Sequence, residues 1–99
     1  MYLSRLFGKS VFVTGASRGI GAAAAKEFAR HGAKVALFAR SKRSLQKVAT
    51  EIGQDTIILP GDVSSFSDVK KAIEATVDKF GSLDVLINNA AALKPIAHL

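Results

Sequence analysis

A run of eight residues, Thr14–Gly21, has the composition and spacing of a phosphate-binding turn. Its sequence, Thr-Gly-Ala-Ser-Arg-Gly-Ile-Gly, contains three glycines in the pattern G-x-x-x-G-x-G. Gly15 would permit a tight turn, Gly19 would let the backbone approach a pyrophosphate, and Gly21 would let a helix pack closely on a sheet. Unpaired N–H groups and the dipole at the start of that helix would then stabilise the phosphates.

Two other interpretations of these glycines need to be weighed. A glycine-rich turn can merely join a strand to a helix, and a P-loop also binds phosphate. The P-loop requires Gly-Lys and then Ser or Thr after four spacer residues, and this sequence has no such segment. The choice between a simple turn and a nucleotide site therefore depends on the surrounding elements.

The hydrophobic pattern alternates between strand-like runs and helix-like stripes. The runs expected to be strands are Val11–Thr14, Lys34–Ala39, Thr56–Leu59 and Asp84–Asn89. The stripes expected to be buried faces of helices are Ile20, Ala24 and Phe28; Leu45, Val48, Ala49 and Ile52; and Val69, Ile73, Thr76, Val77 and Phe80. The expected helix ends are His31–Gly32, Gly53 and Gly81, and the expected N-caps of the second and third helices are Ser41 or Ser44 and Ser65 or Ser67.

The resulting order is βαβαβαβ, and its strands are apolar throughout, which indicates a parallel sheet with helices on both faces. We expect a doubly wound, Rossmann-type α/β fold in which residues 1–99 form a dinucleotide-binding domain. The glycine-rich turn lies between the first strand and the first helix, where such folds bind a pyrophosphate. This position favours a nucleotide site over a simple turn.

The net charge of +6 is unevenly distributed along the 99 residues. Residues 1–50 have ten Lys or Arg and the single acid Glu27, a net +9, whereas residues 51–99 have four Lys and seven acids, a net −3. Aromatic residues do not alternate with the basic ones, so we expect attraction of a phosphorylated small molecule and no nucleic-acid binding. No apolar run reaches the ~20 residues of a membrane span, so we expect no membrane segment. There is no cysteine, so we expect a cytoplasmic protein without a metal site.

The end of the second expected strand indicates which dinucleotide is bound. An acid at this position of a dinucleotide fold binds the ribose 2′-hydroxyl of NAD, whereas a basic residue accommodates the 2′-phosphate of NADP. Here the sequence Phe-Ala-Arg-Ser-Lys-Arg over positions 38–43 has no acid. We expect Arg40 to bind the 2′-phosphate through two parallel hydrogen bonds, with Ser41 as a hydroxyl donor. The alternative is that Arg40, like Lys42 and Arg43, is a solvated charge.

Two further segments complete a known pattern. Gly61-Asp62-Val63 follows the third expected strand, and Asn88-Asn89-Ala90 ends the fourth. Together with Thr14–Gly21, these segments resemble the classical short-chain dehydrogenase/reductase family over essentially the whole chain. The resemblance implies an oxidoreductase that transfers hydride between NADP(H) and a carbonyl or alcohol substrate.

The resemblance also implies roles for individual residues. Asp62 would accept a hydrogen bond from the adenine amino group, with Val63 against the ring; alternatively, Asp62 is the N-cap of the third helix. Asn88 would help to hold the sheet, Asn89 would lie at the cofactor ribose, and Arg18 is similar to a second basic position of NADP-preferring members. The expected cofactor-binding residues are therefore Gly15, Ser17, Arg18, Gly19, Ile20, Gly21, Arg40, Ser41, Asp62, Val63, Asn89 and Ala90.

The catalytic residues of the family have no counterpart in this sequence. The family's chemistry uses a Tyr-x-x-x-Lys pair and an upstream Ser, whereas the single tyrosine here is Tyr2, with Leu6 four residues later. The family usually has glycine where this chain has Ala91, whose methyl group narrows the space beside the nicotinamide ribose. We therefore assign no catalytic residue and expect the chain alone to be inactive.

The sheet is also incomplete relative to the family. An apolar fourth strand at the sheet edge is prone to aggregation, so we expect the missing C-terminal part or another chain to cover it. Two alternatives to a reductase fragment are a non-catalytic dinucleotide-binding module and a truncated product that acts with a partner chain.

Overall fold

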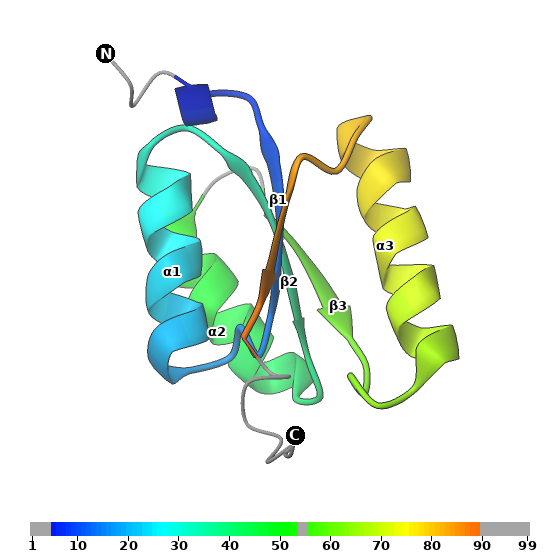
Figure 1. The fold of residues 1–99 in the computed structure, drawn as a ribbon. Coiled ribbons are helices and arrows are strands. Elements are labelled where there is room, and N and C mark those ends of the chain that lie inside the picture. The colour runs from blue at the N-terminus through cyan, green and yellow to red at the C-terminus, as the bar shows by residue number, and fades with distance from the viewer. Residues whose placement is uncertain (1–4, 54–55, 90–99) are drawn as a thin grey trace, which may run out of the picture.

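The computed structural model describes residues 5–53 and 56–89, which form four strands and three α-helices in the expected order (Figure 1). The elements are β1 (Ser10–Thr14), α1 (Gly19–Arg30), β2 (Lys34–Ala39), α2 (Lys42–Ile52), β3 (Thr56–Pro60), α3 (Phe66–Phe80) and β4 (Val85–Asn88). Every strand boundary lies within about one residue of the position expected from the hydrophobic pattern.

The strands form one parallel sheet in the order β3-β2-β1-β4. Val13 of β1 pairs with Leu37 of β2 on one side and with Ile87 of β4 on the other. Helices α1 and α2 cover one face of the sheet and α3 covers the other (Figure 1). This is the expected Rossmann-like arrangement, and it brings the carboxyl ends of all four strands to one edge.

The strands differ in burial because the helices cover the sheet unequally. β1 is buried along its whole length, with Val11 and Val13 packed on the α1–α2 side. On the α3 side, the rings of Phe12 and Phe38 stack with their centroids 5.7 Å apart. β4 instead alternates between half-buried and exposed residues. The central strand β1 is therefore buried on both faces of the sheet, whereas the edge strand β4, although also apolar, is not.

The predicted buried stripe of α1 is only partly correct. Ile20 was expected to face the sheet but is 79% exposed, and Phe28 packs only at the margin of the core. The buried side of the helix consists of Gly21, Ala22, Ala25 and Ala29. The prediction is wrong for Ile20 because small residues, which allow a close approach of helix and sheet, make the contact that larger apolar residues were expected to make.

The other two helices begin at serine N-caps, as expected. The Oγ of Ser41 accepts a hydrogen bond from the N–H of Ser44 at 3.1 Å, and the Oγ of Ser65 accepts one from the N–H of Asp68 at 3.2 Å. In each expected pair, therefore, the first serine is the cap. Both helices end at the expected glycines, which adopt the left-handed conformation.

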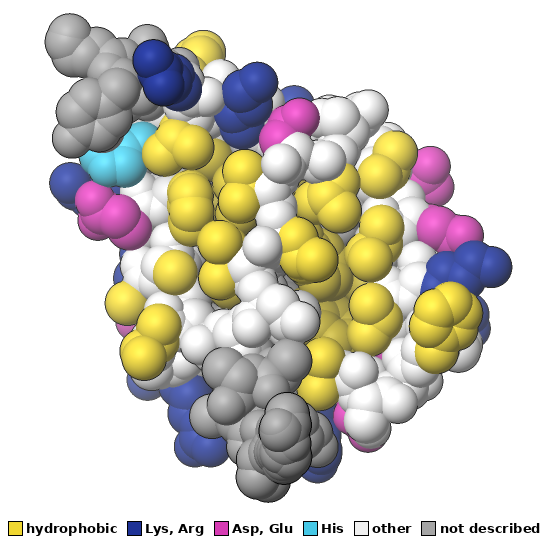
Figure 2. Space-filling view, viewed as in Figure 1, with side chains coloured by type: hydrophobic (Ala, Val, Ile, Leu, Met, Phe, Trp, Pro, Cys, Tyr) yellow, Lys and Arg dark blue, Asp and Glu magenta, His cyan; other side chains and the backbone are white. Residues whose placement is uncertain are grey.

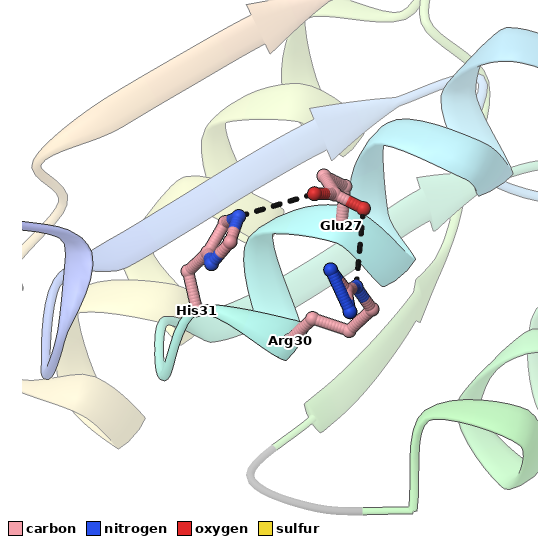
Figure 3. A network of polar contacts seen from close by, with 3 residues as sticks. All are labelled: Glu27, Arg30 and His31. Atoms are coloured by element: carbon pink, nitrogen blue, oxygen red, sulfur yellow. Dashed lines mark hydrogen bonds and ion pairs between the residues drawn. The ribbon is translucent and has the colours of Figure 1, made fainter. Parts of the chain in front are cut away.

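Polar contacts close the last turn of α1 (Figure 3). The carboxylate of Glu27 accepts a hydrogen bond from Nε of Arg30 at 3.2 Å and is 3.1 Å from Nε2 of His31. A cation in this position also interacts favourably with the C-terminal end of the helix dipole. The three residues lie at the end of the helix opposite the glycine-rich turn, so we interpret their contacts as structural.

One edge of the sheet is formed by β4, whose outer side pairs with no other strand in the part of the chain that the structure describes. Leu86 of this strand is 53% exposed. Val77 of α3 is 40% exposed, so the prediction that it lies on the buried face of its helix is wrong. Apolar side chains lie on both sides of this strand in the space-filling view (Figure 2). An apolar edge with unpaired backbone groups is a surface on which further polypeptide can pair.

Candidate dinucleotide site

The glycine-rich turn leaves β1 at the carboxyl edge of the sheet and enters α1. Gly15 and Gly19 have φ angles of +62° and +60°, a region that residues with side chains rarely adopt. Between them, the N–H of Ala16 donates a hydrogen bond to the carbonyl oxygen of Phe38, at the end of β2, at 3.2 Å. The turn is therefore fixed to the neighbouring strand.

Gly21 and Gly19 lie in different surroundings. A Cβ atom on Gly21 would be 2.8 Å from the carbonyl carbon of Gly15, closer still to its oxygen, and 3.1 Å from Nδ2 of Asn89. No described atom lies within 4 Å of the corresponding position on Gly19. Gly21 thus allows close packing, while Gly19 leaves open space at the start of the helix.

α1 differs from the other two helices at its N-terminus. Its N-cap residue, Arg18, makes no capping hydrogen bond with its side chain, whereas serines cap α2 and α3. Its first turn, like that of α2, contains no acid. The first N–H groups of any α-helix lack an acceptor within the helix. The start of α1 therefore presents backbone donors and the positive end of the helix dipole, which together suit an anion.

The end of β2 lies between the glycine-rich turn and the loop that follows β3. The carbonyl oxygen of Ala39 accepts a hydrogen bond from the N–H of Gly61 at 2.9 Å. Arg40 follows directly and is exposed at this edge, as is Arg18 in the turn. The hydroxyl of Ser41, expected to be a donor to the cofactor, donates here to the Oγ of Ser44 at 3.1 Å.

Asp62 lies at the carboxyl end of β3 but does not cap α3. The cap is Ser65, so the alternative interpretation of Asp62 as an N-cap is wrong. Instead, Oδ1 of Asp62 accepts hydrogen bonds from the N–H and the Oγ of Ser64, at 2.9 and 2.8 Å. These two bonds orient the carboxylate at the edge of the sheet. Val63 is half-buried and packs against the cluster that contains Phe12 and Phe38.

The two asparagines at the end of β4 have different surroundings. Oγ1 of Thr14 donates a hydrogen bond to Oδ1 of Asn88 at 3.3 Å, which joins the ends of β1 and β4, as expected for the first asparagine. Asn89 is half-buried and reaches the start of α1 beside Gly21. Ala90, Ala91 and Tyr2 lie outside the described residues.

Thr14 begins the glycine-rich segment but is not among the expected cofactor-binding residues. Its hydroxyl is also 3.4 Å from the carbonyl oxygen of Ile87, so it links β1 to β4 at their carboxyl ends. The signal in the sequence is a threonine at the last position of a buried strand, directly before the first glycine of the turn.

Other kinds of site find little support in the described residues. No group of three or more His, Cys, Asp or Glu side chains among them could hold a metal ion. None of the three helices has the length and apolar content needed to cross a membrane.

A parallel sheet with an uncapped, glycine-lined helix start at its carboxyl edge defines a Rossmann-like protein. Residues 9–99 match the family model described as short chain dehydrogenase. The chain therefore belongs to the short-chain dehydrogenase family, and it corresponds to the N-terminal, cofactor-binding region of its relatives.

Curated relatives agree with this family. The chain is 50% identical over 94 residues to 11-beta-hydroxysteroid dehydrogenase-like 2 of Arabidopsis thaliana, covering 91% of this chain and 30% of that protein. It is 36% identical over 97 residues to sorbitol dehydrogenase of Cereibacter sphaeroides, covering 96% of this chain and 38% of that protein. The chain thus spans 30% and 38% of the length of these relatives.

Solved structures agree with the fold. Glucose dehydrogenase of Caenorhabditis elegans in the apo form has a TM-score of 0.82 at 35% identity, over 86% of this chain and 38% of that one. A 3-ketoacyl-(acyl-carrier-protein) reductase from Brucella melitensis complexed with NADH has a TM-score of 0.79 at 43% identity, over 82% of this chain and 34% of that one.

Proposed function

We propose that this chain binds NADP(H) as the cofactor-binding region of an oxidoreductase that acts on a carbonyl or alcohol substrate. The observation that carries the proposal is the start of α1 at the carboxyl edge of the sheet. It lacks a side-chain cap, and the turn that leads into it contains two glycines with positive φ, Gly15 and Gly19. When bound, the nicotinamide would supply or accept hydride. The residues described here bind and orient the cofactor, and none of them is assigned a catalytic role.

The start of α1 would hold the pyrophosphate. The first backbone N–H groups of the helix point out of its N-terminus, and the open space at Gly19 lets an anion approach them. The hydrogen bond from Ala16 to Phe38 keeps the turn in place before any ligand arrives. The donor set is therefore organised in advance, which reduces the entropy lost on binding.

Arg40 would favour NADPH over NADH. It is exposed at the end of β2, and neither the end of this strand nor the first turn of α2 contains an acid that would repel a 2′-phosphate. Arg18 lies in the adjacent turn and adds a second positive charge. One similar structure was solved with NADH, so the preference of this chain needs a direct measurement.

The remaining expected residues would contact the adenosine and ribose groups. Asp62 has an oriented carboxylate at the same edge, and Asn89 lies beside the start of α1. We propose that Asp62 accepts a hydrogen bond from the adenine amino group and that Asn89 binds a ribose hydroxyl. The apolar edge at β4 would be covered by further polypeptide of the same protein or by another chain.

The test is a comparison of NADPH and NADH binding by calorimetry in the original chain and in Arg40→Asp. Charge-assisted hydrogen bonds contribute about 1.5–3 kcal/mol, so this substitution should weaken NADPH binding by about 10- to 100-fold. The matched control is Arg43→Asp, an identical charge change three residues away at an exposed position. Equal affinity of the original chain for the two cofactors would refute the preference for NADPH.

A further inference from the structure

A hollow of about 490 Å³ lies between α1 and α2, directly beside the glycine-rich turn. Ser17 and Arg18 line it from the turn, Lys26 lines it from α1, and Lys47 and Glu51 line it from α2. Three cations therefore surround this space, against one carboxylate. Neither lysine is among the expected cofactor-binding residues.

An ion pair neutralises part of the positive charge around the hollow. Lys26 pairs with Glu51 and thereby connects α1 to α2, with both side chains about half exposed. This hydrogen-bonded pair, its charge attraction and the nearby charge of Lys47 hold the pKa of Glu51 below its ordinary value. Because one carboxylate balances one lysine, Arg18 and Lys47 leave an excess of two positive charges beside the turn.

A purely structural role does not account well for Lys47. Lys47 is the central residue of α2 and lies outside both end turns, so it neither caps the helix nor interacts strongly with the helix dipole. Lys47 and Glu51 are four residues apart, but with lysine first, the weaker order for such a pair. Glu51 is also already paired with Lys26 on α1.

We propose that the hollow is an extension of the cofactor site and that Lys47, together with Arg18, determines specificity for the 2′-phosphate of the dinucleotide. This inference rests on the proposed binding of NADP(H). Ser17 and Arg18 belong both to the turn that would hold the pyrophosphate and to the wall of the hollow. Arg18, already expected to lie near the 2′-phosphate, shares the hollow with Lys47, whose four-carbon stem would allow its ammonium group to move towards that phosphate.

Two small probes isolate the contribution of Lys47 to binding of the 2′-phosphate. 2′,5′-ADP and 5′-AMP share the adenosine and the 5′-phosphate and differ only in the 2′-phosphate. Because exposed charge pairs are weak, Lys47→Gln should reduce 2′,5′-ADP binding by about three- to fivefold and change 5′-AMP binding by less than about twofold. Lys47→Arg should restore the binding of 2′,5′-ADP. Glu51→Gln should strengthen it, because the opposing carboxylate is removed.

The matched control is Lys79→Gln, which removes an exposed lysine from the far end of α3 and should leave both affinities unchanged. Inorganic phosphate is titrated as well. If it competes with 2′,5′-ADP in the original chain but not in Lys47→Gln, the phosphate site is confirmed.

The outcomes separate this inference from the proposed function. If Lys47→Gln binds 2′,5′-ADP as the original chain does while Arg40→Asp binds it weakly, the role of Lys47 is refuted and the NADP(H) site stands. An equal loss of both probes also refutes the specific role. If the original chain does not distinguish the two probes, the proposed preference for NADP(H) fails, and the inference fails with it.

Discussion

Replacing Gly21 with alanine tests the packing at the start of α1. In an ordinary helical position, alanine is more favourable than glycine by about 1 kcal/mol, so the substitution would stabilise the chain. Here the new methyl carbon would lie 2.8 Å from the carbonyl carbon of Gly15, and closer still to its oxygen. Neither group is the end of a flexible side chain that can turn away. The sign of the change in the free energy of unfolding therefore shows whether Gly21 and Gly15 approach each other this closely.

The expected magnitude follows from these two opposing effects. Overpacking of a well-packed site costs about 1–3 kcal/mol, and the clash here involves backbone, so we expect the upper part of that range. After subtraction of the helix-propensity gain, the free energy of unfolding should fall by about 1–2 kcal/mol. For a chain of this size, that lowers the urea midpoint by about 1 M.

The assay is urea unfolding followed by circular dichroism, with Gly53→Ala as the matched control. Gly53 also has a positive φ, +74°, but its nearest neighbour to a new Cβ is 3.8 Å away, so only backbone strain is added there. Gly21→Ala should in addition weaken NADPH binding, because the turn must move away from the helix, whereas the control should bind normally. An unchanged or higher urea midpoint for Gly21→Ala would contradict the close approach of Gly15 and Gly21.

Two further predictions concern stability away from the glycines. Oδ2 of Asp84 accepts a hydrogen bond from the N–H of Ser10 at 2.8 Å, which, with help from Ser82, holds the pKa of this carboxyl below its ordinary value of 3.8. The ionised carboxylate therefore stabilises the fold above about pH 4, and this contribution is lost as the pH falls through the folded-state pKa. We expect Asp84→Asn to lower the thermal midpoint at pH 7 and the difference to shrink as the pH falls below 4; a difference that is independent of pH would rule out this linkage. Ser65→Ala should lower the free energy of unfolding by about 1 kcal/mol through loss of the α3 cap, measured by urea unfolding. Ser67→Ala, in the first turn of the same helix, is its control, and equal effects of the two substitutions would contradict the assignment of Ser65 as the cap.

The fold could be predicted from the sequence because its signals are local. Strand-like runs alternate with helical stripes, and serines and glycines mark the helix ends, so each element can be identified without knowledge of its neighbours. The parallel, doubly wound arrangement of the sheet also follows, since such units have few arrangements, whereas the order β3-β2-β1-β4 is a finding of the structure. The exposure of Ile20 could not be predicted in this way, because it depends on how closely α1 approaches the sheet.

The candidate site was predictable to a different extent. The glycine spacing located the start of α1, and the lack of an acid after β2 drew attention to Arg40. The bond between Thr14 and Asn88 and the ion pair between Lys26 and Glu51 join residues far apart in the sequence. Such contacts depend on the register of the strands and the packing of the helices, neither of which a hydrophobic pattern specifies.

The structure also separates two demands that the same turn must meet. Gly21 is required by packing in the chain itself, whereas Gly19 has open space before it and a φ of +60° that a side chain would strain. A substitution at Gly21 therefore acts first on folding, and one at Gly19 acts on folding only through backbone strain while placing a methyl group where the pyrophosphate would approach. Glycines that look equivalent in the motif thus serve stability and binding in different proportions. The ratio of binding loss to stability loss is therefore the quantity that distinguishes a cofactor site from a structural turn.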